Sequence, residues 1–419
     1  MATTEELHRA VLVAVQRPDV DDAEFAASLV ELRRLAKTLG LQVAATCTQR
    51  RPTFHPGTYV GSGKLGELKG LLADGAADTV VVDHEITPSQ ARNLEKATGA
   101  VVMDRTAVIL EIFHRHASSR AARAQVEIVR LQYMAPRLRE QGAGKDRQRG
   151  GIGGKGAGES GVELDRRKIR DRIAELTAEL ASLEQERRTQ RARRRDLARV
   201  ALVGYTNAGK STLMRALTGS DVYVADKLFA TLDTTVRTLV PETRPRILVS
   251  DTVGFIEKLP HGLVASFKST LAEALEASLL AHVVDASDPG FERQLAVTAE
   301  VLAEIGAGDV PRLLVFNKID RVGDAAAQAE TARALLARWP DALVISAKDP
   351  ADVARLHAAL AAFFARDRIE AELRVPWDRQ QLRGEIFAAC EVVEERAEAD
   401  GAVFRVRADR DTIARLGGS

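Results

Sequence analysis

The chain has few cysteines, few aromatic residues and no long apolar run. Its 419 residues include two cysteines, Cys47 and Cys390, too few and too far apart for a disulfide framework or a zinc site of the usual paired spacing. No apolar run approaches the roughly 18 residues that span a bilayer, and Met1 to Arg9 is not a basic-then-apolar leader. We therefore expect a cytoplasmic protein with no membrane span.

Aromatic residues make up only 4% of the chain, so few side chains are available as stacking platforms for bases. The hydrophobic share of 45% and the charged share of 28% are typical of a soluble globular protein, and the length favours several domains. The formal net charge of +1 conceals arginine-rich runs such as residues 191–195. Local charge is therefore more informative than total charge.

Apolar periodicity divides the chain into four predicted parts. Short apolar runs such as Val11–Val15 alternate with helical patterns in the first part, which indicates α/β structure with a largely parallel sheet. A helix between Thr87 and Gly99 has its Pro and Gly at the expected ends. The predicted parts are an α/β domain (1–118), a helical hairpin with a glycine-rich basic loop (119–198), a doubly wound sheet domain (199–366) and a small α+β domain (367–419).

Two later segments carry more specific predictions of secondary structure. Apolar residues recur at helical spacing in the second helix of the hairpin, which predicts one narrow apolar stripe on a charged surface: Ile169, Ile173, Leu176, Leu180 and Leu183. In the last part we expect a helix around Leu382–Val393 and a strand over residues 402–406.

A phosphate-binding loop is predicted between an apolar strand ending at Val203 and a helical segment beginning at Thr212. Its glycines let successive N–H groups face phosphates, Lys210 neutralises the β and γ oxygens, and the Ser211 hydroxyl can ligate Mg²⁺. The predicted nucleotide contacts in this loop are Gly204, Tyr205, Thr206, Asn207, Ala208, Gly209, Lys210, Ser211 and Thr212.

Asp251-Thr252-Val253-Gly254 directly follows the next apolar strand. The Asp251 carboxylate can hold the metal through water, and Gly254 can hinge and offer its N–H to the γ-phosphate. The next residue is Phe255, which cannot orient an attacking water as a glutamine would, so intrinsic hydrolysis is expected to be slow. A partner, another segment or a monovalent cation must complete the site. Asn207 is a candidate ligand for such a cation, and a turn-capping role for this Asn is an equal alternative.

We expect the base of the nucleotide to be recognised by Asn317, Lys318 and Asp320. The Asp320 carboxylate only accepts hydrogen bonds, and guanine presents the two adjacent donors that adenine lacks. Ser346, Ala347 and Lys348 follow another strand and place a backbone N–H near guanine O6. GTP and GDP are therefore the predicted nucleotides.

Residues 227–235 lie between the phosphate loop and Asp251 and form a candidate switch, with Phe229, Ala230 and Thr231 as nucleotide contacts. An exposed threonine-rich strand edge is the alternative, because threonine favours strands. Together these loops predict a Mg²⁺-dependent GTPase with a low intrinsic rate. Its predicted catalytic residues are Lys210, Thr231 and Gly254, and its predicted metal ligands are Ser211, Thr231 and Asp251.

With these loops in place, the chain resembles the HflX family of the Obg–HflX superfamily of GTPases over nearly its whole length. The residues that carry the resemblance are 58–64, 125–127, 150–167, 228–233 and 251–256. The resemblance implies that Thr231 senses the metal and that a hydrophobic Phe255 is normal, and it links Asn207 to potassium. It also implies binding to the large ribosomal subunit and its rRNA, and separation of stalled or idle ribosomes under stress.

The sequence departs from the family pattern in two places. Thr234 stands where the family usually has proline, which leaves the switch freer. Residues 154–157 read Gly-Lys-Gly-Ala where the family commonly shows Arg-Gly-Pro, which affects contacts made by that arginine. GTP binding is expected to be unaffected by either change.

Basic residues gather on the glycine-rich arm and are the candidate RNA contacts: Arg137, Arg139, Lys145, Arg147, Arg149 and Lys155. A solvated charged hairpin is the alternative. Residues 61–64 hint at a second phosphate loop in the first domain, where the resemblance implies an adenine nucleotide, although a plain strand-to-helix turn is favoured. Two other functions stay open: a ribosome-assembly or RNA clamp with a GTP switch, and an RNA-remodelling protein acting through the first domain.

Overall fold

The computed structural model describes residues 8–73, 76–138, 161–192, 198–220, 228–244, 246–260, 263, 272–366, 368–379, 381–408 and 410–417. Internal contacts group the chain into two compact units. Unit 1 contains residues 1–185 together with two short segments, 227–229 and 258–267. Unit 2 contains the remainder. Within the described ranges, no helix is long and apolar enough to cross a membrane.

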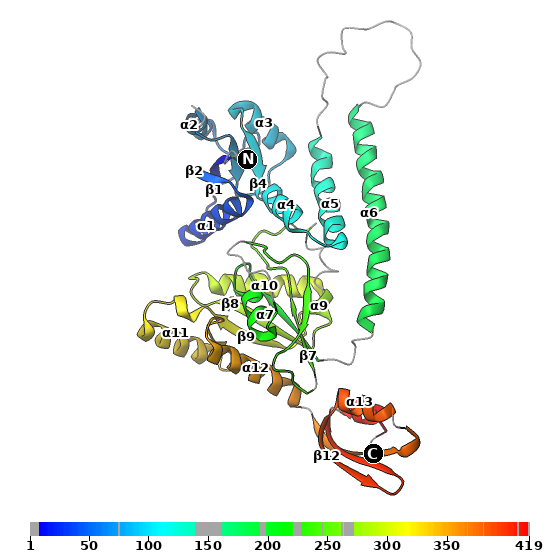
Figure 1. Ribbon diagram of the computed structural model, residues 1–419. Helices are drawn as coiled ribbons and strands as arrows, with labels where there is room; N and C mark the ends of the chain where they lie inside the picture. Colours follow the sequence, from blue (N-terminus) through cyan, green and yellow to red (C-terminus); the bar gives the residue numbers. More distant parts are fainter. Residues whose placement is uncertain are drawn as a thin grey trace, which may run out of the picture. The chain divides into compact units, whose positions relative to one another are not determined.

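Unit 1 contains a parallel four-stranded sheet in the order β2-β1-β3-β4 (Figure 1). The prediction of a buried parallel sheet is confirmed, because β1 and β3 are apolar and buried along nearly their whole length. The elements are β1 (Arg9–Gln16), α1 (Asp22–Leu39), β2 (Gln42–Arg50), α2 (Ser62–Leu72), β3 (Thr79–Val82), α3 (Pro88–Thr98), β4 (Val101–Asp104) and α4 (Arg105–His116).

The predicted caps of α3 are present. The Thr87 hydroxyl accepts from the Gln90 N–H and the Gln90 side chain accepts from the Thr87 N–H, which is a capping box. Gly99 ends the helix with a φ of 73°. The residues 61–64 do not follow a strand directly, because β2 ends at Arg50; Gly61 is the extended N-cap of α2, and Lys64 pairs with Glu67 at 2.7 Å.

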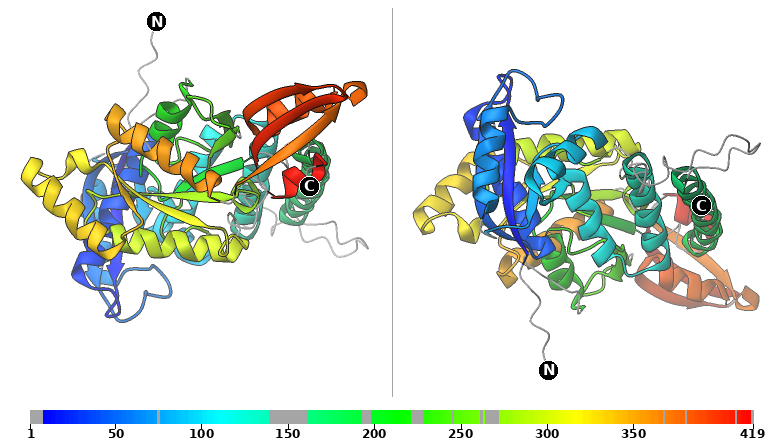
Figure 2. Two further views of the ribbon diagram at one scale, coloured as in Figure 1. Left: turned by 90° about the horizontal axis from the view of Figure 1, so that it is seen from below. Right: turned by 90° about the horizontal axis from the view of Figure 1, so that it is seen from above.

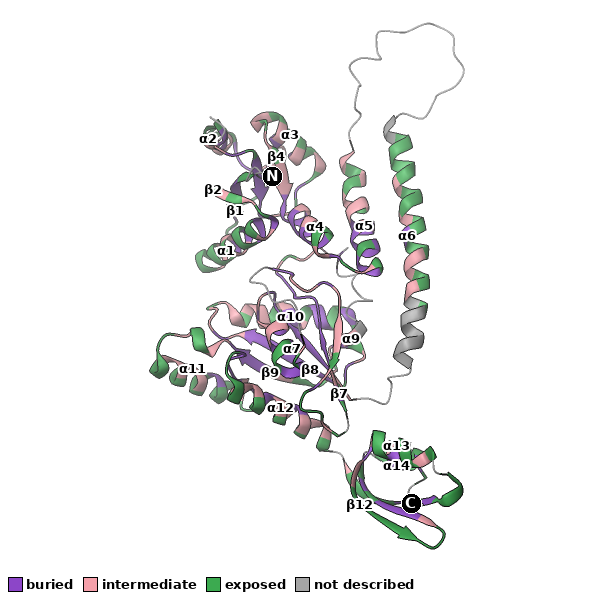
Figure 3. Ribbon diagram, in the orientation of Figure 1, coloured by how far each residue is buried: buried purple, intermediate pink, exposed green. Residues whose placement is uncertain are grey.

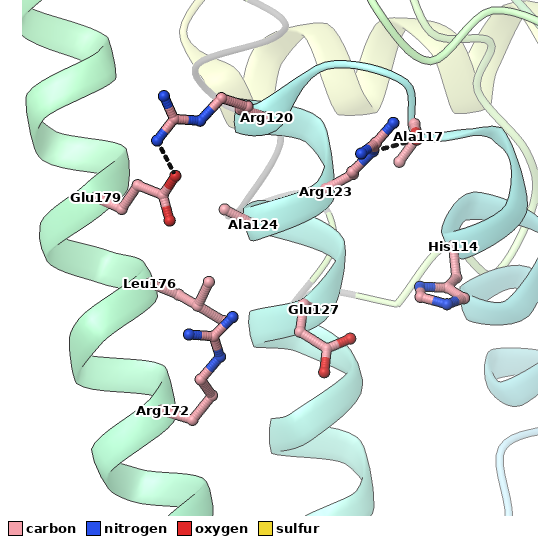
Figure 4. Close-up of a pocket in the computed structure, with 9 residues that line it drawn as sticks. All are labelled: His114, Ala117, Arg120, Arg123, Ala124, Glu127, Arg172, Leu176 and Glu179. Carbon is pink, nitrogen blue, oxygen red and sulfur yellow. Dashed lines mark hydrogen bonds and ion pairs between the residues drawn. The ribbon is translucent and has the colours of Figure 1, made fainter.

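Two helices form the predicted hairpin. They are α5 (Arg120–Met134), which is followed by the short 3₁₀ helix η2 (Ala135–Arg137), and α6 (Gly161–Ala192), which belongs to unit 1 as far as residue 185. The α6 stripe packs on α5: Leu176 is buried with Ala124 and Ile128, and Ile173 and Leu180 flank them. Figure 4 shows Leu176 facing α5, with the Arg120–Glu179 ion pair joining the two helices at 2.8 Å. The glycine-rich loop lies outside the described residues.

Unit 2 contains a six-stranded sheet in the order β10-β9-β8-β5-β7-β6, parallel except for β6. This is the predicted doubly wound arrangement. Figure 3 shows its central strands buried and α11 and α12 with exposed outer faces. The elements are β5 (Ala198–Gly204), α7 (Lys210–Thr218), β6 (Thr235–Thr238), β7 (Ile247–Asp251), α9 (Ala272–Leu275), β8 (Leu279–Asp285), α10 (Phe291–Ile305), β9 (Arg312–Asn317), η4 (Ile319–Arg321), α11 (Ala325–Arg338), β10 (Leu343–Val344) and α12 (Pro350–Ala365).

The end of the chain forms a three-stranded antiparallel sheet in the order β11-β13-β12, seen as a curved sheet in Figure 2. Its elements are β11 (Ile369–Pro376), η5 (Trp377–Arg379), α13 (Gln381–Ala389), β12 (Glu391–Glu398), β13 (Gly401–Ala408) and α14 (Arg410–Arg415). The predicted strand over residues 402–406 is confirmed. The prediction of a helix as far as Val393 is wrong at its end. The helix α13 ends at Ala389, and Val392 pairs with Val406 in the sheet.

Candidate functional site

The phosphate loop joins the end of β5 to the start of α7, as predicted. Its glycines are required by space as well as by conformation. Gly204 has a φ of 143°, and a Cβ there would lie 2.1 Å from the Val283 carbonyl oxygen. Gly209 has a φ of 100°, and a Cβ there would lie 2.2 Å from Asn317 Nδ2. A side chain at either position would displace the neighbouring strand or the loop that contains Asn317.

Lys210 is the first residue of α7, and only 6% of its surface is exposed. Its ammonium donates to the carbonyls of Gly204 at 3.0 Å and Tyr205 at 2.8 Å, so the side chain folds back over the loop. Burial lowers the pKa of Lys210 to about 8, and the nearby Asp251 carboxylate opposes that change. The ammonium thus lies at the positive end of a helix, in the place where a phosphate group is most strongly stabilised.

Ser211, Thr231 and Asp251 converge beside the phosphate loop, although they come from three separate segments. The Ser211 hydroxyl donates to Asp251 Oδ2 at 2.7 Å, and the Thr231 hydroxyl donates to the same oxygen at 3.0 Å. The two hydroxyl oxygens are 2.8 Å apart. The sequence singled out these residues as metal ligands, and the structure brings them together.

Asp251 is fully buried at the end of β7, and burial raises the pKa of its carboxyl group, while Lys210 and the two hydroxyls oppose the increase. Among the described residues, its Oδ1 atom has no hydrogen-bond partner. An unsatisfied buried carboxylate oxygen is costly unless a cation or water completes it.

The loop from Asp251 to Gly254 lies against the phosphate loop. The Thr252 hydroxyl donates to the Leu202 carbonyl at 2.7 Å, and Val253 is buried. A Cβ at Gly254 would lie 2.8 Å from Thr206 Cα and 3.0 Å from Lys210 Nζ, so the position accepts only glycine in this arrangement. Gly254 therefore lies in close contact with the phosphate loop.

Phe255 follows Gly254 and is 2% exposed. Its N–H donates to the Gly204 carbonyl at 3.1 Å, and its carbonyl accepts from the Thr206 N–H at 2.7 Å. Its side chain is apolar and buried, so it cannot orient a water molecule for attack. The described residues thus lack a water-orienting amide at the position where some GTPases carry glutamine.

The loops predicted to bind the base are joined by side-chain hydrogen bonds. The Asn317 amide donates to the Ala208 carbonyl at 2.9 Å, and its oxygen accepts from the Ala347 N–H at 2.9 Å. The Ser346 hydroxyl donates to Asp320 Oδ1 at 2.7 Å, and Lys348 Nζ lies 3.3 Å from Asp320 Oδ2. Burial alone would raise the pKa of Asp320, but the hydrogen bonds from Ser346 and Lys348 outweigh it and lower the pKa, which keeps the group ionised.

Lys318 has a left-handed backbone with a φ of 65°. Its ammonium bonds to the Asn207 carbonyl and lies 2.7 Å from Asp285 Oδ2. Asn207 is also left-handed, with a φ of 60°. Sequence reasoning missed Asp285, because a single carboxylate after a strand matches no motif.

Phe229 groups with unit 1, unlike Thr231 two residues later. Its ring lies 4.5 Å from that of Phe113, edge to face, and its carbonyl is 2.7 Å from His116 Nδ1. The side chain is 3% exposed in this environment. Nucleotide contact by Phe229 and Ala230 stays a prediction.

Among the candidate RNA contacts, only Arg137 lies within the described residues. Its guanidinium donates to the Ile86 carbonyl at 2.8 Å and pairs with Asp104 at 3.3 Å, and it lies 3.6 Å from the centre of the Tyr133 ring. These contacts hold η2 against Ile86 and the end of β4. A phosphate would have to compete with them for Arg137.

Three family models match successive parts of the chain. They are described as GTP-binding GTPase N-terminal (residues 26–114), GTP-binding GTPase middle region (116–194) and 50S ribosome-binding GTPase (199–318). A GTPase HflX from Gluconacetobacter diazotrophicus is 54% identical, with 99% of this chain and 98% of the relative aligned. The chain belongs to the HflX family of GTPases.

More distant proteins are also similar to the chain. The GTPase HflX of Escherichia coli is 38% identical over 94% of this chain and 92% of its own length. A GTP-binding protein from Sulfolobus solfataricus, solved with GDP, is 24% identical and covers 85% of this chain and 99% of its own. The TM-score of that comparison is 0.45. Family membership establishes that the chain binds and hydrolyses GTP.

Proposed function

We propose that this GTPase binds the large ribosomal subunit and separates stalled or idle ribosomes under stress, and that contact with the subunit completes its catalytic site. The observation that carries the proposal is Phe255. It occupies the position beside Gly254 with a buried apolar side chain, so the chain supplies no group there to orient water. The description of the matching family model, a 50S ribosome-binding GTPase, supports this choice of partner.

We further propose that Mg²⁺ acts as cofactor, held by Ser211, Thr231 and Asp251. The donor set fits, because hydroxyl and carboxylate oxygens are the hard ligands that Mg²⁺ prefers. The unpartnered Oδ1 of Asp251 also fits, since it is a buried acceptor turned toward no hydrogen-bond donor in the described residues. When bound, Mg²⁺ supplies countercharge to the phosphates.

The chain's own residues then have separate roles in hydrolysis. Lys210 neutralises phosphate oxygens, and the N–H groups of the phosphate loop hold them in place. Thr231 responds to the γ-phosphate through its hydroxyl, and Gly254 responds to it through its backbone N–H. Asp320 selects guanine by accepting from its two adjacent donors. Potassium beside Asn207 is a further proposal, tested by comparing turnover in potassium and sodium for wild type and Asn207→Ala.

Subunit profiles on sucrose gradients test the ribosome proposal. Protein with a non-hydrolysable GTP analogue is expected to shift intact ribosomes toward free subunits, and Asp320→Asn is expected not to do so with the same analogue. If saturating protein binds isolated large subunits tightly but leaves intact ribosomes unchanged, an assembly or RNA clamp is the better description. An absence of binding to either would contradict the proposal.

A further inference from the structure

Asp285 is a partly buried carboxylate beside the phosphate loop, and none of the predicted nucleotide-binding loops includes it. It is the last residue of β8, which lies between β5 and β9 in the sheet. Val283 pairs with Gly204 on one side, and Asp285 pairs with Asn317 on the other. Its side chain therefore emerges at the carboxyl edge of the sheet, between the phosphate loop and the base-binding loop.

Both carboxylate oxygens of Asp285 are held in fixed directions. Oδ1 accepts from the Ser287 N–H at 3.0 Å and from the Ser287 hydroxyl at 2.6 Å. Oδ2 accepts from Lys318 Nζ at 2.7 Å. The side chains of Lys318 and Asp285 are only 11% and 16% exposed, so water and salt screen the pair much less than a surface ion pair.

Lys318 connects the Asp285 carboxylate to the phosphate loop. The same ammonium bonds to the Asn207 carbonyl, while the neighbouring Asn317 amide bonds to the Ala208 carbonyl at 2.9 Å. Two successive peptide planes of the phosphate loop are thereby fixed. Because a peptide N–H points opposite to its carbonyl, the Gly209 N–H is turned away from Asn317. Orientation of N–H groups is what lets such a loop bind phosphate.

We propose that Asp285 is a positioning residue for nucleotide binding, which acts through Lys318 to hold the phosphate loop in its binding conformation. Asn207 and Lys318 both have left-handed backbones, which non-glycine residues keep only when neighbouring contacts enforce them. Without the Asp285 charge, Lys318 keeps one carbonyl partner and the Asn207 turn loosens. Loss of the Asp285 charge weakens the binding of nucleoside diphosphates and triphosphates alike, whatever their base.

The test compares Asp285→Asn with Asp288→Asn in the full chain. Asp288 lies three residues along the same loop, and its carboxylate bonds to the Gly290 N–H and the Gln294 amide, each at 2.9 Å. We expect Asp285→Asn to raise the Kd for fluorescent GDP and for a GTP analogue by about tenfold or more. KM for GTP should rise with it, whereas kcat should change by less than about threefold. Asp288→Asn should match wild type.

A double-mutant cycle separates positioning from general damage. If Asp285 acts through Lys318, the double variant Asp285→Asn with Lys318→Met binds GDP no more weakly than Lys318→Met alone. Should Asp285→Asn fail to fold, Asp285→Glu keeps the charge and displaces it, and the same cycle is measured on the GDP dissociation rate. Additive losses in the cycle, or a Kd within about twofold of wild type in a folded Asp285→Asn, would overturn the proposal.

Discussion

The Ser346 hydroxyl donates a hydrogen bond to Asp320 Oδ1 at 2.7 Å, which joins the two loops predicted to read the base. This bond holds the Asp320 carboxylate in a fixed direction. It also lowers the pKa of the carboxyl group, which keeps the group ionised. An acceptor fixed in this way favours a purine with two adjacent donors. The relationship leads directly to a test of base selection.

Asp320→Asn is expected to move the nucleotide preference from GTP toward xanthosine triphosphate. The amide offers a donor where the carboxylate offered only acceptors, so guanine loses a partner and xanthine gains one. Competition binding with GTP, XTP and ATP measures the change. Ser346→Ala is the matched variant, expected to weaken GTP by about tenfold at most without changing the preference. Wild-type GTP affinity in Asp320→Asn would show that Asp320 does not read the base.

Nucleotide affinity is expected to fall as the pH rises through about 8. The Lys210 pKa is lowered to about 8 by burial, and only the protonated ammonium neutralises phosphate. In the unliganded chain, the lowered pKa of Lys210 affects folding in the opposite direction. Above pH 8 the folded state binds fewer protons than the unfolded state, so the free energy of unfolding rises as the cost of burying the ammonium falls.

The measurement for this prediction is GDP affinity between pH 7 and 9.5 in wild type and Lys210→Met. Wild type should lose up to about tenfold per pH unit above the pKa, and the variant should bind weakly with little pH dependence. Equal pH dependence in both proteins would assign the titration to another group.

Gly254→Ala is expected to slow hydrolysis by about tenfold or more while changing GDP affinity little. The added Cβ would lie 2.8 Å from Thr206 Cα, so the loop could not keep its approach to the phosphate loop. Gly66→Ala is the matched control, because a Cβ there meets nothing within 4 Å. Single-turnover hydrolysis is the measurement. Unchanged turnover in Gly254→Ala would show that hydrolysis does not depend on the close approach of Gly254 to the phosphate loop.

Leu176→Ala is expected to destabilise the hairpin by about 2 to 4 kcal/mol, because Leu176 is 4% exposed and fills the contact between α5 and α6. Hydrogen exchange of α6 amides measures the loss. Leu164→Ala provides the control, since Leu164 lies on the same helix and is 43% exposed. Equal exchange in the two variants would mean that the packing at Leu176 does not hold α6 in place.

The site was more predictable than parts of the fold. Gly204 and Asp251 end strands, Lys210 begins the helix that follows the first of them, and Asp320 lies just beyond β9, so the positions agree with the chemistry that the motifs predict. β2 was not predicted, because residues 42–50 mix polar and apolar side chains at the edge of a sheet. The true end of α13 was missed because Val392 and Val393 extend an apolar pattern that suits a helix or a strand equally.

Asp285 shows a different limit. Its importance depends on the pairing of β8 with β5 and β9, which no local spacing encodes. The signal that could have identified it is the sequence Val284-Asp285-Ala286-Ser287, an acidic residue at the end of a buried strand with a hydroxyl two residues later.

The central claim is that the large ribosomal subunit completes the catalytic site. The most direct test is GTP turnover in potassium buffer with and without purified large subunits. The account predicts stimulation of at least about tenfold, which is about 1.4 kcal/mol off the barrier, and its loss in Gly254→Ala. Turnover that is unchanged by saturating large subunits, in a preparation that binds GTP normally, would contradict it.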